Sequence, residues 1–246
     1  MRTRRIYVDD ELVAGSTIEL PADTVNYLRN VLRLRDGQPL ELFNGRGWRG
    51  HGRLELARRE ARVRVESSEA SPKESVVPIT LLAALAKGEK MELVIQKAVE
   101  LGVTAIMPID TERSVLELTG SRAEKRLVRW RQIMINASEQ CGRNRLPTIE
   151  PIRPLEQALT TTDAPVRLVL DPRAERPLAE LRDQPRPDAV ALLVGPEGGL
   201  TETEVALAGT HGFRALTLGP RILRAETAAI TGIAVLQYQW GDLGQA

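Results

Sequence analysis

The chain is organised around the stretch Leu193-Val194-Gly195-Pro196-Glu197-Gly198-Gly199-Leu200-Thr201. Residues 189–194 are all apolar and rich in branched side chains, which predicts a strand buried on both faces. The glycines that follow release the backbone from the strand. Thr201-Glu202-Thr203-Glu204 then fits a capping box, in which the side chains of Thr201 and Glu204 each accept a hydrogen bond from the other residue's backbone amide. The predicted order is strand, glycine loop, helix.

The same order recurs further along the chain. Residues 215–218 predict a short strand, Gly219-Pro220 interrupts it, and residues 226–240 have the apolar period of a helix. In an open α/β sheet, ligands bind beyond the carboxyl ends of the strands, where both loops would lie. The loops lack the Gly-x-Gly-x-x-Gly spacing of a dinucleotide fold and the Gly-Lys-Ser/Thr ending of a phosphate loop. The pattern therefore favours a different nucleoside-like ligand and disfavours an NAD-dependent dehydrogenase.

Length and composition narrow the class of protein. A chain of 246 residues can form one large domain or two. It has no apolar run near the roughly 20 residues that span a bilayer, and its basic start is not followed by the apolar core of a signal peptide, so we expect a cytoplasmic protein without a membrane anchor. The single cysteine, Cys141, excludes an internal disulfide, and with only two histidines, His51 and His211, the composition argues against a metal site.

Charge is distributed unevenly along the chain. The net charge of +1 is too small for a protein that coats nucleic acid over its whole surface. Arginines nevertheless concentrate in residues 2–5, 29–35, 46–64 and 122–145, whereas residues 150–204 are acidic on balance. Such clusters can follow a phosphate backbone, although each arginine can equally be ordinary solvated surface.

The first 72 residues predict a small β-barrel. Alternating runs at residues 17–20, 39–43 and 61–66 are typical of strands, and residues 21–33 have helical spacing. Residues 67–75 are polar, lack periodicity and contain proline, which predicts a linker.

Residues 73–246 predict a second, α/β domain. We expect strands at residues 79–85, 103–107 and 166–170, and helices at 89–101 and from 121 toward 142, with Pro108 ending the second of these strands. Together with the two strands near the C-terminus, this alternation predicts a mainly parallel sheet covered by helices on both faces.

Several motifs of this second part occur together in one known family. The glycine loop at residues 193–201 and the run Leu218-Gly219-Pro220-Arg221-Ile222-Leu223-Arg224-Ala225-Glu226-Thr227-Ala228 resemble those of the RsmE family of ribosomal RNA methyltransferases. Two more matches are Lys87-Gly88-Glu89-Lys90-Met91-Glu92 with Lys97-Ala98-Val99-Glu100-Leu101-Gly102, and Ala137-Ser138-Glu139-Gln140-Cys141-Gly142-Arg143. The resemblance covers the whole second part of the chain.

The resemblance implies both an architecture and an activity. It implies a PUA-like RNA-binding barrel at residues 1–72 and a SPOUT-type, trefoil-knotted methyltransferase domain at residues 73–246. It implies a homodimer that uses S-adenosylmethionine to methylate N3 of a uridine in the 16S ribosomal RNA of the small subunit. The chain pattern itself does not reveal a knot, because threaded chains leave no sequence period and are rare.

The resemblance also implies roles for particular residues. Arginines suit the negative charge that develops on the uracil carbonyl oxygens, and carboxylates are candidate proton acceptors. Arg143 and its neighbours would come from the partner subunit. The candidates are, for catalysis, Arg224, Glu226, Arg143 and Glu139; for the cofactor, Leu170, Val194, Gly195, Glu197, Gly198, Gly199, Leu218, Gly219, Ile222, Leu223 and Thr227; and for RNA, Arg4, Arg5, Arg29, Arg33 and Arg35.

Alternative interpretations exist for several of these features. Glu226 can be a carboxylate favoured by the dipole at a helix start rather than a base. Cys141 can be a nucleophile, but N3 methylation needs no covalent adduct at a pyrimidine carbon, so a buried packing residue is expected instead. The rival functions are a related methyltransferase acting on another RNA atom, such as a ribose 2′-hydroxyl, and a non-catalytic RNA-binding assembly factor.

Overall fold

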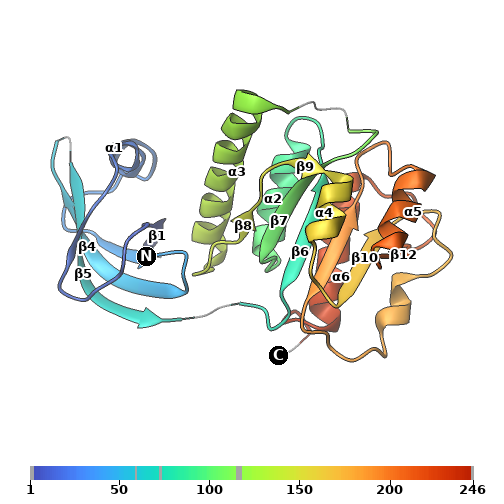
Figure 1. The fold of residues 1–246 in the computed structure, drawn as a ribbon. Helices are drawn as coiled ribbons and strands as arrows, with labels where there is room; N and C mark the ends of the chain where they lie inside the picture. Colours follow the sequence, from blue (N-terminus) through green and yellow to red (C-terminus); the bar gives the residue numbers. More distant parts are fainter. Residues whose placement is uncertain (1–2, 59, 72–73, 115–117, 245–246) are drawn as a thin grey trace. The chain divides into compact units, whose positions relative to one another are not determined.

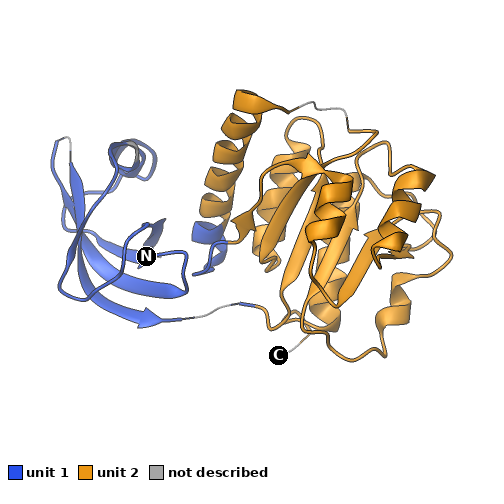
Figure 2. Cartoon of the chain, in the orientation of Figure 1, with its two compact units in different colours: residues 1–74, 138–146 blue, residues 75–137, 147–246 orange. Residues whose placement is uncertain are grey.

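The chain forms two compact units in the computed structural model (Figure 1), which describes residues 3–58, 60–71, 74–114 and 118–244. Unit 1 comprises residues 1–74 and 138–146, and unit 2 comprises residues 75–137 and 147–246 (Figure 2). The predicted domain boundary between residues 72 and 73 lies outside the described residues. The inclusion of residues 138–146 in unit 1 was not expected from the sequence.

Unit 1 is built on a five-stranded sheet with the order β1-β3-β4-β5-β2. β1 pairs with β3 in parallel, and the other neighbours are antiparallel. Alternate side chains, such as Leu42, Leu54 and Val63, point into one buried core. The strands are β1 (Arg4–Tyr7), β2 (Thr17–Glu19), β3 (Pro39–Phe43), β4 (Trp48–Leu56) and β5 (Ala61–Ala70).

The residues predicted to start the linker are part of β5. Residues 67–70 pair with the first part of β4, so the strand runs to Ala70 and the linker prediction was wrong there. The register shifts between His51 and Gly52, which marks a β-bulge. A Cβ atom on Gly52 would lie 2.4 Å from the carbonyl oxygen of Arg64, so the close approach of the two strands requires glycine.

The helix predicted over residues 21–33 is present in a modified form. α1 (Ala22–Asn26) continues directly into a π-helical turn, η1 (Tyr27–Val31), in which the amide of Leu32 donates to the carbonyl of Tyr27. Arg33 follows with a positive φ of 53°. The turn places Leu28 in the core and leaves the side chain of Val31 exposed.

Unit 2 is built on a seven-stranded sheet, and the strand pairings among its described residues are all parallel. The order is β12-β10-β11-β6-β7-β8, and β9 also pairs with β7. The predicted mainly parallel sheet is therefore confirmed. The strands are β6 (Ile79–Ala84), β7 (Ala105–Asp110), β8 (Thr148–Ile149), β9 (Arg153–Pro154), β10 (Val166–Leu170), β11 (Val190–Val194) and β12 (Arg214–Leu216).

Helices cover both faces of this sheet (Figure 1). Along β11, Leu192 packs with α2 (Lys90–Glu100), α3 (Gly120–Cys141) and α6 (Ala225–Gln239) on one face. Its neighbour Leu193 packs with α4 (Leu155–Thr161) and α5 (Glu202–Thr210) on the other. A short 3₁₀ turn, η2 (Leu178–Leu181), precedes β11. None of the helices in the described residues is both long and apolar enough to cross a membrane.

β7 does not end at Pro108, as the sequence had suggested, but continues to Asp110. The carbonyl of Ile106 accepts from the amide of Glu150, so Pro108, two residues later, faces the same side of the strand. On that side β8 pairs only with Ala105 and Ile106, and β9 only with Ile109 and Asp110. Because Pro108 falls between the two short strands, the sheet does not need the amide proton that proline lacks.

Candidate functional site

Three loops meet at one edge of the sheet in unit 2. β10, β11 and β12 are parallel neighbours, so the loops that leave their carboxyl ends lie side by side. The amide of Asp171, directly after β10, donates to the carbonyl of Leu216 at the end of β12 at 3.1 Å. The three segments proposed to hold a cofactor are therefore gathered in one place.

A pocket with about 320 Å³ of empty space opens between the β10 and β12 loops and the start of α6. This volume includes space that is open to solvent. Four of the nine lining residues are leucines, and apolar walls of this kind are usual for small-molecule sites. Leu170, Leu218 and Leu223 had been proposed from the sequence, whereas the other lining residues had not. The complete lining is Leu170, Asp171, Pro172, Leu216, Thr217, Leu218, Arg221, Leu223 and Ala228.

Some proposed cofactor residues do not line this pocket. The side chain of Ile222 is 87% exposed, because its neighbour Leu223 takes the inward position in the loop. Val194 is buried in the core beneath the loop, and Thr227 is exposed on the first turn of α6. Gly195, Gly198, Gly199 and Gly219 are not part of the lining either, and the β11 loop contributes no residue to it.

The glycine loop after β11 is a closed turn that ends in a helix cap. The amide of Gly199 donates to the carbonyl of Pro196 at 2.8 Å, and Gly199 has a φ of 70°. No atom lies within 4 Å of the position that a Cβ on Gly199 would take, so this side of the turn is open. The predicted capping box is confirmed, because the Thr201 hydroxyl accepts from the amide of Glu204 and the Glu204 carboxylate accepts from that of Thr201.

Glu197, proposed to contact the cofactor, binds protein groups in this structure. Its carboxylate accepts hydrogen bonds from Lys90 Nζ at 3.0 Å and from the amide of Lys87 at 3.3 Å. Burial alone would raise the pKa of Glu197, but hydrogen bonds from its own amide, from Lys90 and from Lys87 outweigh burial and lower it. Glu197 thus fastens the glycine loop to the start of α2.

Two arginines that the sequence analysis missed also hold this loop. Arg173 binds both carboxylate oxygens of Asp171 and donates to the carbonyl of Leu200 at 3.0 Å, so it joins the β10 loop to the β11 loop. Arg113, just after β7, donates to the carbonyl of Gly198 at 2.9 Å. A single arginine beyond a strand gives no spacing signal, so neither residue could be distinguished in the sequence from solvated surface.

Arg224 and Glu226 lie where the β12 loop enters α6. Arg224 is the exposed N-cap residue, and its carbonyl accepts from the amide of Ala228, which lines the pocket. Glu226 is in the first helical turn, and its Oε2 atom is buried without a hydrogen-bond partner among the described residues. The helix dipole favours a carboxylate here, but it does not account for an unsatisfied buried oxygen, which costs free energy. Glu226 is not among the residues that line the pocket, so a ligand reaches this oxygen only after a local movement.

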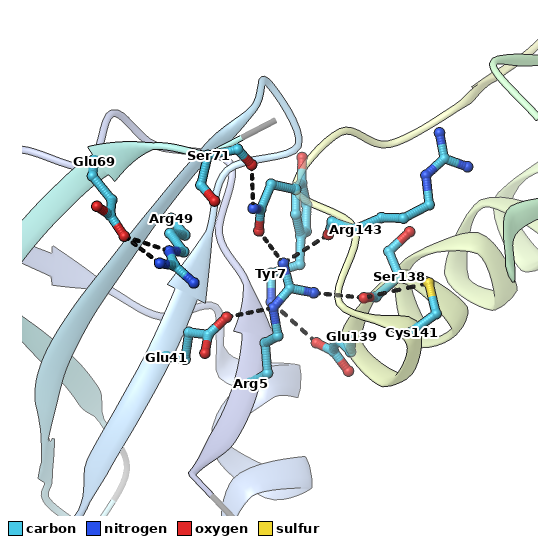
Figure 3. A network of polar contacts seen from close by, with 11 residues as sticks. Arg5, Tyr7, Glu41, Arg49, Glu69, Ser71, Ser138, Glu139, Cys141 and Arg143 are labelled. Atoms are coloured by element: carbon cyan, nitrogen blue, oxygen red, sulfur yellow. Dashed lines mark hydrogen bonds and ion pairs between the residues drawn. The ribbon is translucent and has the colours of Figure 1, made fainter. Parts of the chain in front are cut away.

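The other two proposed catalytic residues belong to unit 1, where they surround Arg5 (Figure 3). Arg5 donates to the carbonyls of Ser138 and Arg143 at 2.5 and 2.7 Å, to Glu41 at 2.8 Å and to the side chain of Asn144. Its guanidinium also lies 4.0 Å above the ring of Phe43. Arg5 had been proposed to bind RNA, but its side chain is only 9% exposed and its donors are used inside unit 1.

Glu139 and Arg143 have structural partners in this network. The amide of Tyr7 donates to the Glu139 carboxylate at 3.1 Å. The pKa of Glu139 is raised, because the effect of burial outweighs the opposite effects of this hydrogen bond and of the charge of Arg5. Arg143 forms an ion pair with Glu74 at 2.5 Å, and both side chains are largely buried. Cys141 is exposed, so the expected burial of its side chain was wrong. The catalytic roles of Glu139 and Arg143 stay predictions.

Most arginines of the cluster at residues 46–64 are paired with glutamates. Across β4 and β5, Arg49 pairs with Glu69 and Arg53 with Glu66. Arg29, proposed to bind RNA, donates to the carbonyls of residues 57 and 58. The cluster is therefore partly neutralised within the sheet. The proposed RNA-contacting residues whose side chains are exposed are Arg4, Arg33 and Arg35.

The chain is similar to known proteins over both units. A family model described as the RNA methyltransferase domain matches residues 73–237, and one described as the RNA methyltransferase PUA domain matches residues 20–66. The ribosomal RNA small subunit methyltransferase E of Buchnera aphidicola subsp. Schizaphis graminum is 34% identical over 244 residues, which cover 98% of each chain. The enzyme of that name from Neisseria gonorrhoeae, solved bound to S-adenosyl methionine, is 39% identical with a TM-score of 0.90, covering 98% of this chain and 100% of its own. A methyltransferase from Legionella pneumophila, solved with bound cofactor SAM, is 40% identical with a TM-score of 0.94, covering 99% of this chain and 100% of its own.

Proposed function

The chain belongs to the RNA methyltransferase family that includes ribosomal RNA small subunit methyltransferase E, and we propose that it methylates N3 of a uridine in 16S ribosomal RNA. S-adenosylmethionine is the proposed methyl donor. The observation that carries the proposal is the meeting of the β10, β11 and β12 loops at one edge of the sheet, with a mainly apolar pocket between the β10 loop, the β12 loop and α6. Two solved relatives with bound S-adenosylmethionine share the fold at 39–40% identity, which supports this use of the loops. The choice of N3 rests on the resemblance of the sequence motifs.

The residues at the pocket fit this cofactor. Leu170, Leu218 and Leu223 offer apolar walls to a flat adenine ring. Gly199 leaves open space beside its backbone, where a ribose or its hydroxyl groups can approach without meeting a Cβ atom. Bound S-adenosylmethionine would supply a methyl group carried on a positively charged sulfur.

We assign the remaining chemistry to Arg224 and Glu226. Methylation requires the N3 proton of uracil to leave, and negative charge then spreads onto the two flanking carbonyl oxygens. The exposed guanidinium of Arg224 donates hydrogen bonds to such an oxygen. Glu226 would accept the N3 proton on its unsatisfied oxygen. The N3 electron pair would then form the new N–C bond as the bond between the methyl group and the donor sulfur breaks, which would leave the donor as a neutral thioether.

The RNA must present the base outside a helix, because N3 lies in the Watson–Crick edge and is hidden when uracil is paired. We propose that unit 1 contacts the RNA through its exposed arginines, among them Arg4, Arg33 and Arg35. Its match to a PUA domain supports this assignment. The resemblance further implies a trefoil knot in unit 2, a homodimer and action in the cytoplasm on the small ribosomal subunit. The catalytic roles of Glu139 and Arg143 depend on that proposed dimer.

The test is methyl transfer from labelled S-adenosylmethionine to small ribosomal subunits that lack the modification, followed by nucleoside digestion and mass spectrometry. We expect 3-methyluridine. A methylated ribose would keep the cofactor assignment and reject the uracil N3 target. RNA binding without incorporation of label would favour the assembly-factor alternative. Parallel assays on naked 16S RNA and on assembled subunits identify which of them is the substrate.

A further inference from the structure

The glycine loop after β11 is held by charged residues from three neighbouring loops of unit 2. Lys90, at the start of α2, binds the carboxylate of Glu197 at 3.0 Å. Arg173, after β10, donates to the carbonyl of Leu200 at 3.0 Å. Arg113, after β7, donates to the carbonyl of Gly198 at 2.9 Å. Of the three, only Arg113 binds one of the adjacent glycines Gly198 and Gly199, on the segment that we assign to the cofactor; its partner is Gly198.

The side chain of Arg113 also packs against Gly198. The Cβ, Cγ and Cδ atoms of Arg113 lie 3.2, 3.8 and 3.4 Å from the position that a Cβ atom on Gly198 would take. They are the three nearest atoms to that position. The arginine therefore covers the backbone of Gly198 with its alkyl chain while its guanidinium holds the carbonyl, so it restrains this peptide both by contact and by a hydrogen bond.

The turn that carries Arg113 is fixed by other groups. The Ser114 hydroxyl binds both the amide and the hydroxyl of Thr111, at 3.0 and 2.9 Å. The amide of Glu112 donates to Glu204 at 2.8 Å, and Glu204 also belongs to the capping box of α5. These contacts do not involve the guanidinium of Arg113. Removing that guanidinium should therefore release the glycine loop and leave the turn at residues 111–114 in place.

We propose that Arg113 is a positioning residue for S-adenosylmethionine: it holds Gly198 so that the backbone of the glycine loop is arranged for the cofactor before the cofactor binds. Arg113 acts through Gly198 and does not itself transfer a proton or a methyl group. Among the described residues, Arg113 is exposed and forms no ion pair, so its guanidinium does not serve to neutralise a neighbouring carboxylate. The inference rests on the proposed function, since it concerns the same cofactor loop.

Three substitutions in the full-length chain test this role. Arg113→Met keeps the alkyl contact and removes the hydrogen bond, and we expect it to weaken S-adenosylmethionine binding about tenfold, the lower end for a charged hydrogen bond. Arg113→Lys keeps one donor and should restore most of the affinity. Gly198→Ala keeps every charge but pushes against Arg113, and a shift of this kind should weaken binding about fivefold. Arg186→Met is the matched control, since Arg186 is an exposed arginine just before β11, at the opposite end of that strand.

The readouts are cofactor affinity by calorimetry, the KM for the RNA substrate, hydrogen exchange of the Gly199 amide without cofactor, and the melting temperature. We expect weaker cofactor binding and faster exchange in Arg113→Met and Gly198→Ala, with an unchanged RNA KM and melting temperature. A raised RNA KM with unchanged cofactor affinity would make Arg113 an RNA contact and overturn the proposal, and so would an equal loss in Arg186→Met. Failure of the unsubstituted chain to bind S-adenosylmethionine would instead reject the proposed function.

Discussion

Replacing Arg5 should show whether this residue stabilises unit 1 or binds RNA. In Arg5→Met the carbonyls of Ser138 and Arg143, the side chain of Asn144 and the carboxylate of Glu41 all lose their donor. Hydrogen bonds to a charged group contribute about 1.5–3 kcal/mol each, but bonds from one guanidinium are not additive. Removing one partner of a buried ionic group typically costs about 3–5 kcal/mol, and the 9% exposure of the Arg5 side chain supports that range.

The assay for Arg5→Met is hydrogen exchange of peptides from β1 and residues 138–146, because a two-unit chain does not have one unfolding free energy. We expect exchange in both segments to become faster by the equivalent of several kcal/mol, with unit 2 unchanged. Arg4→Met is the matched control, since Arg4 is the exposed neighbour in the same strand. The reasoning is refuted if Arg5→Met lowers RNA affinity while exchange at residues 138–146 stays at the level of the unsubstituted chain.

Three further substitutions test the site. Gly199→Arg should abolish binding of S-adenosylmethionine, because the side chain enters the open space beside the loop; the φ of 70° adds strain of about 1–2 kcal/mol, which is too little to unfold the chain, and a folded variant with normal affinity by calorimetry would contradict this. Arg224→Ala should lower the methyl-transfer rate at least tenfold, as expected for the loss of a donor to a developing charge, with little change in cofactor affinity; equal turnover would remove its catalytic role. Burial raises the pKa of Glu139, so the folded state binds the proton more tightly and stability falls as pH rises from about 4.3 through the raised pKa. Glu139→Gln should therefore stabilise unit 1 at pH 7 more than at pH 4 in exchange measurements, and an equal effect at both values would argue against a raised pKa.

The elements fixed by local sequence could be predicted well. The all-apolar run of β11 required burial on both faces, and Thr201 with Glu204 required a helix start, because each depends on residues a few positions apart. The end of β7 could not be predicted. Whether Pro108 stops a strand depends on whether the sheet needs a hydrogen bond at that point, and here the answer comes from β8 and β9, about 40 residues later in the chain.

The place of the proposed site could be predicted from the sequence, but the contacts of its individual residues could not. Leu170, Leu218 and Leu223 line the pocket because they lie at or beyond the ends of parallel strands, which the alternation of elements already implied. Ile222 has the same chemistry as its neighbour Leu223, and only the path of the loop exposes it. The segment 138–146 gave no sign that it joins unit 1, since its partner Arg5 is more than 130 residues away.

The arginines show why a count of basic residues overestimates an RNA-binding surface. A loop with three glycines in five residues, 195–199, cannot hold one conformation through its own side chains, so neighbouring loops must supply donors for its carbonyls and partners for its carboxylate. Arg113, Arg173 and Lys90 all do this at the carboxyl edge of the sheet. RNA is also expected near that edge, so an arginine or lysine there can either hold the glycine loop or bind RNA. Its position in the sequence does not distinguish these two roles. The acceptor distinguishes them: a guanidinium already bound to a loop carbonyl restrains the protein, whether or not its remaining donors reach a phosphate.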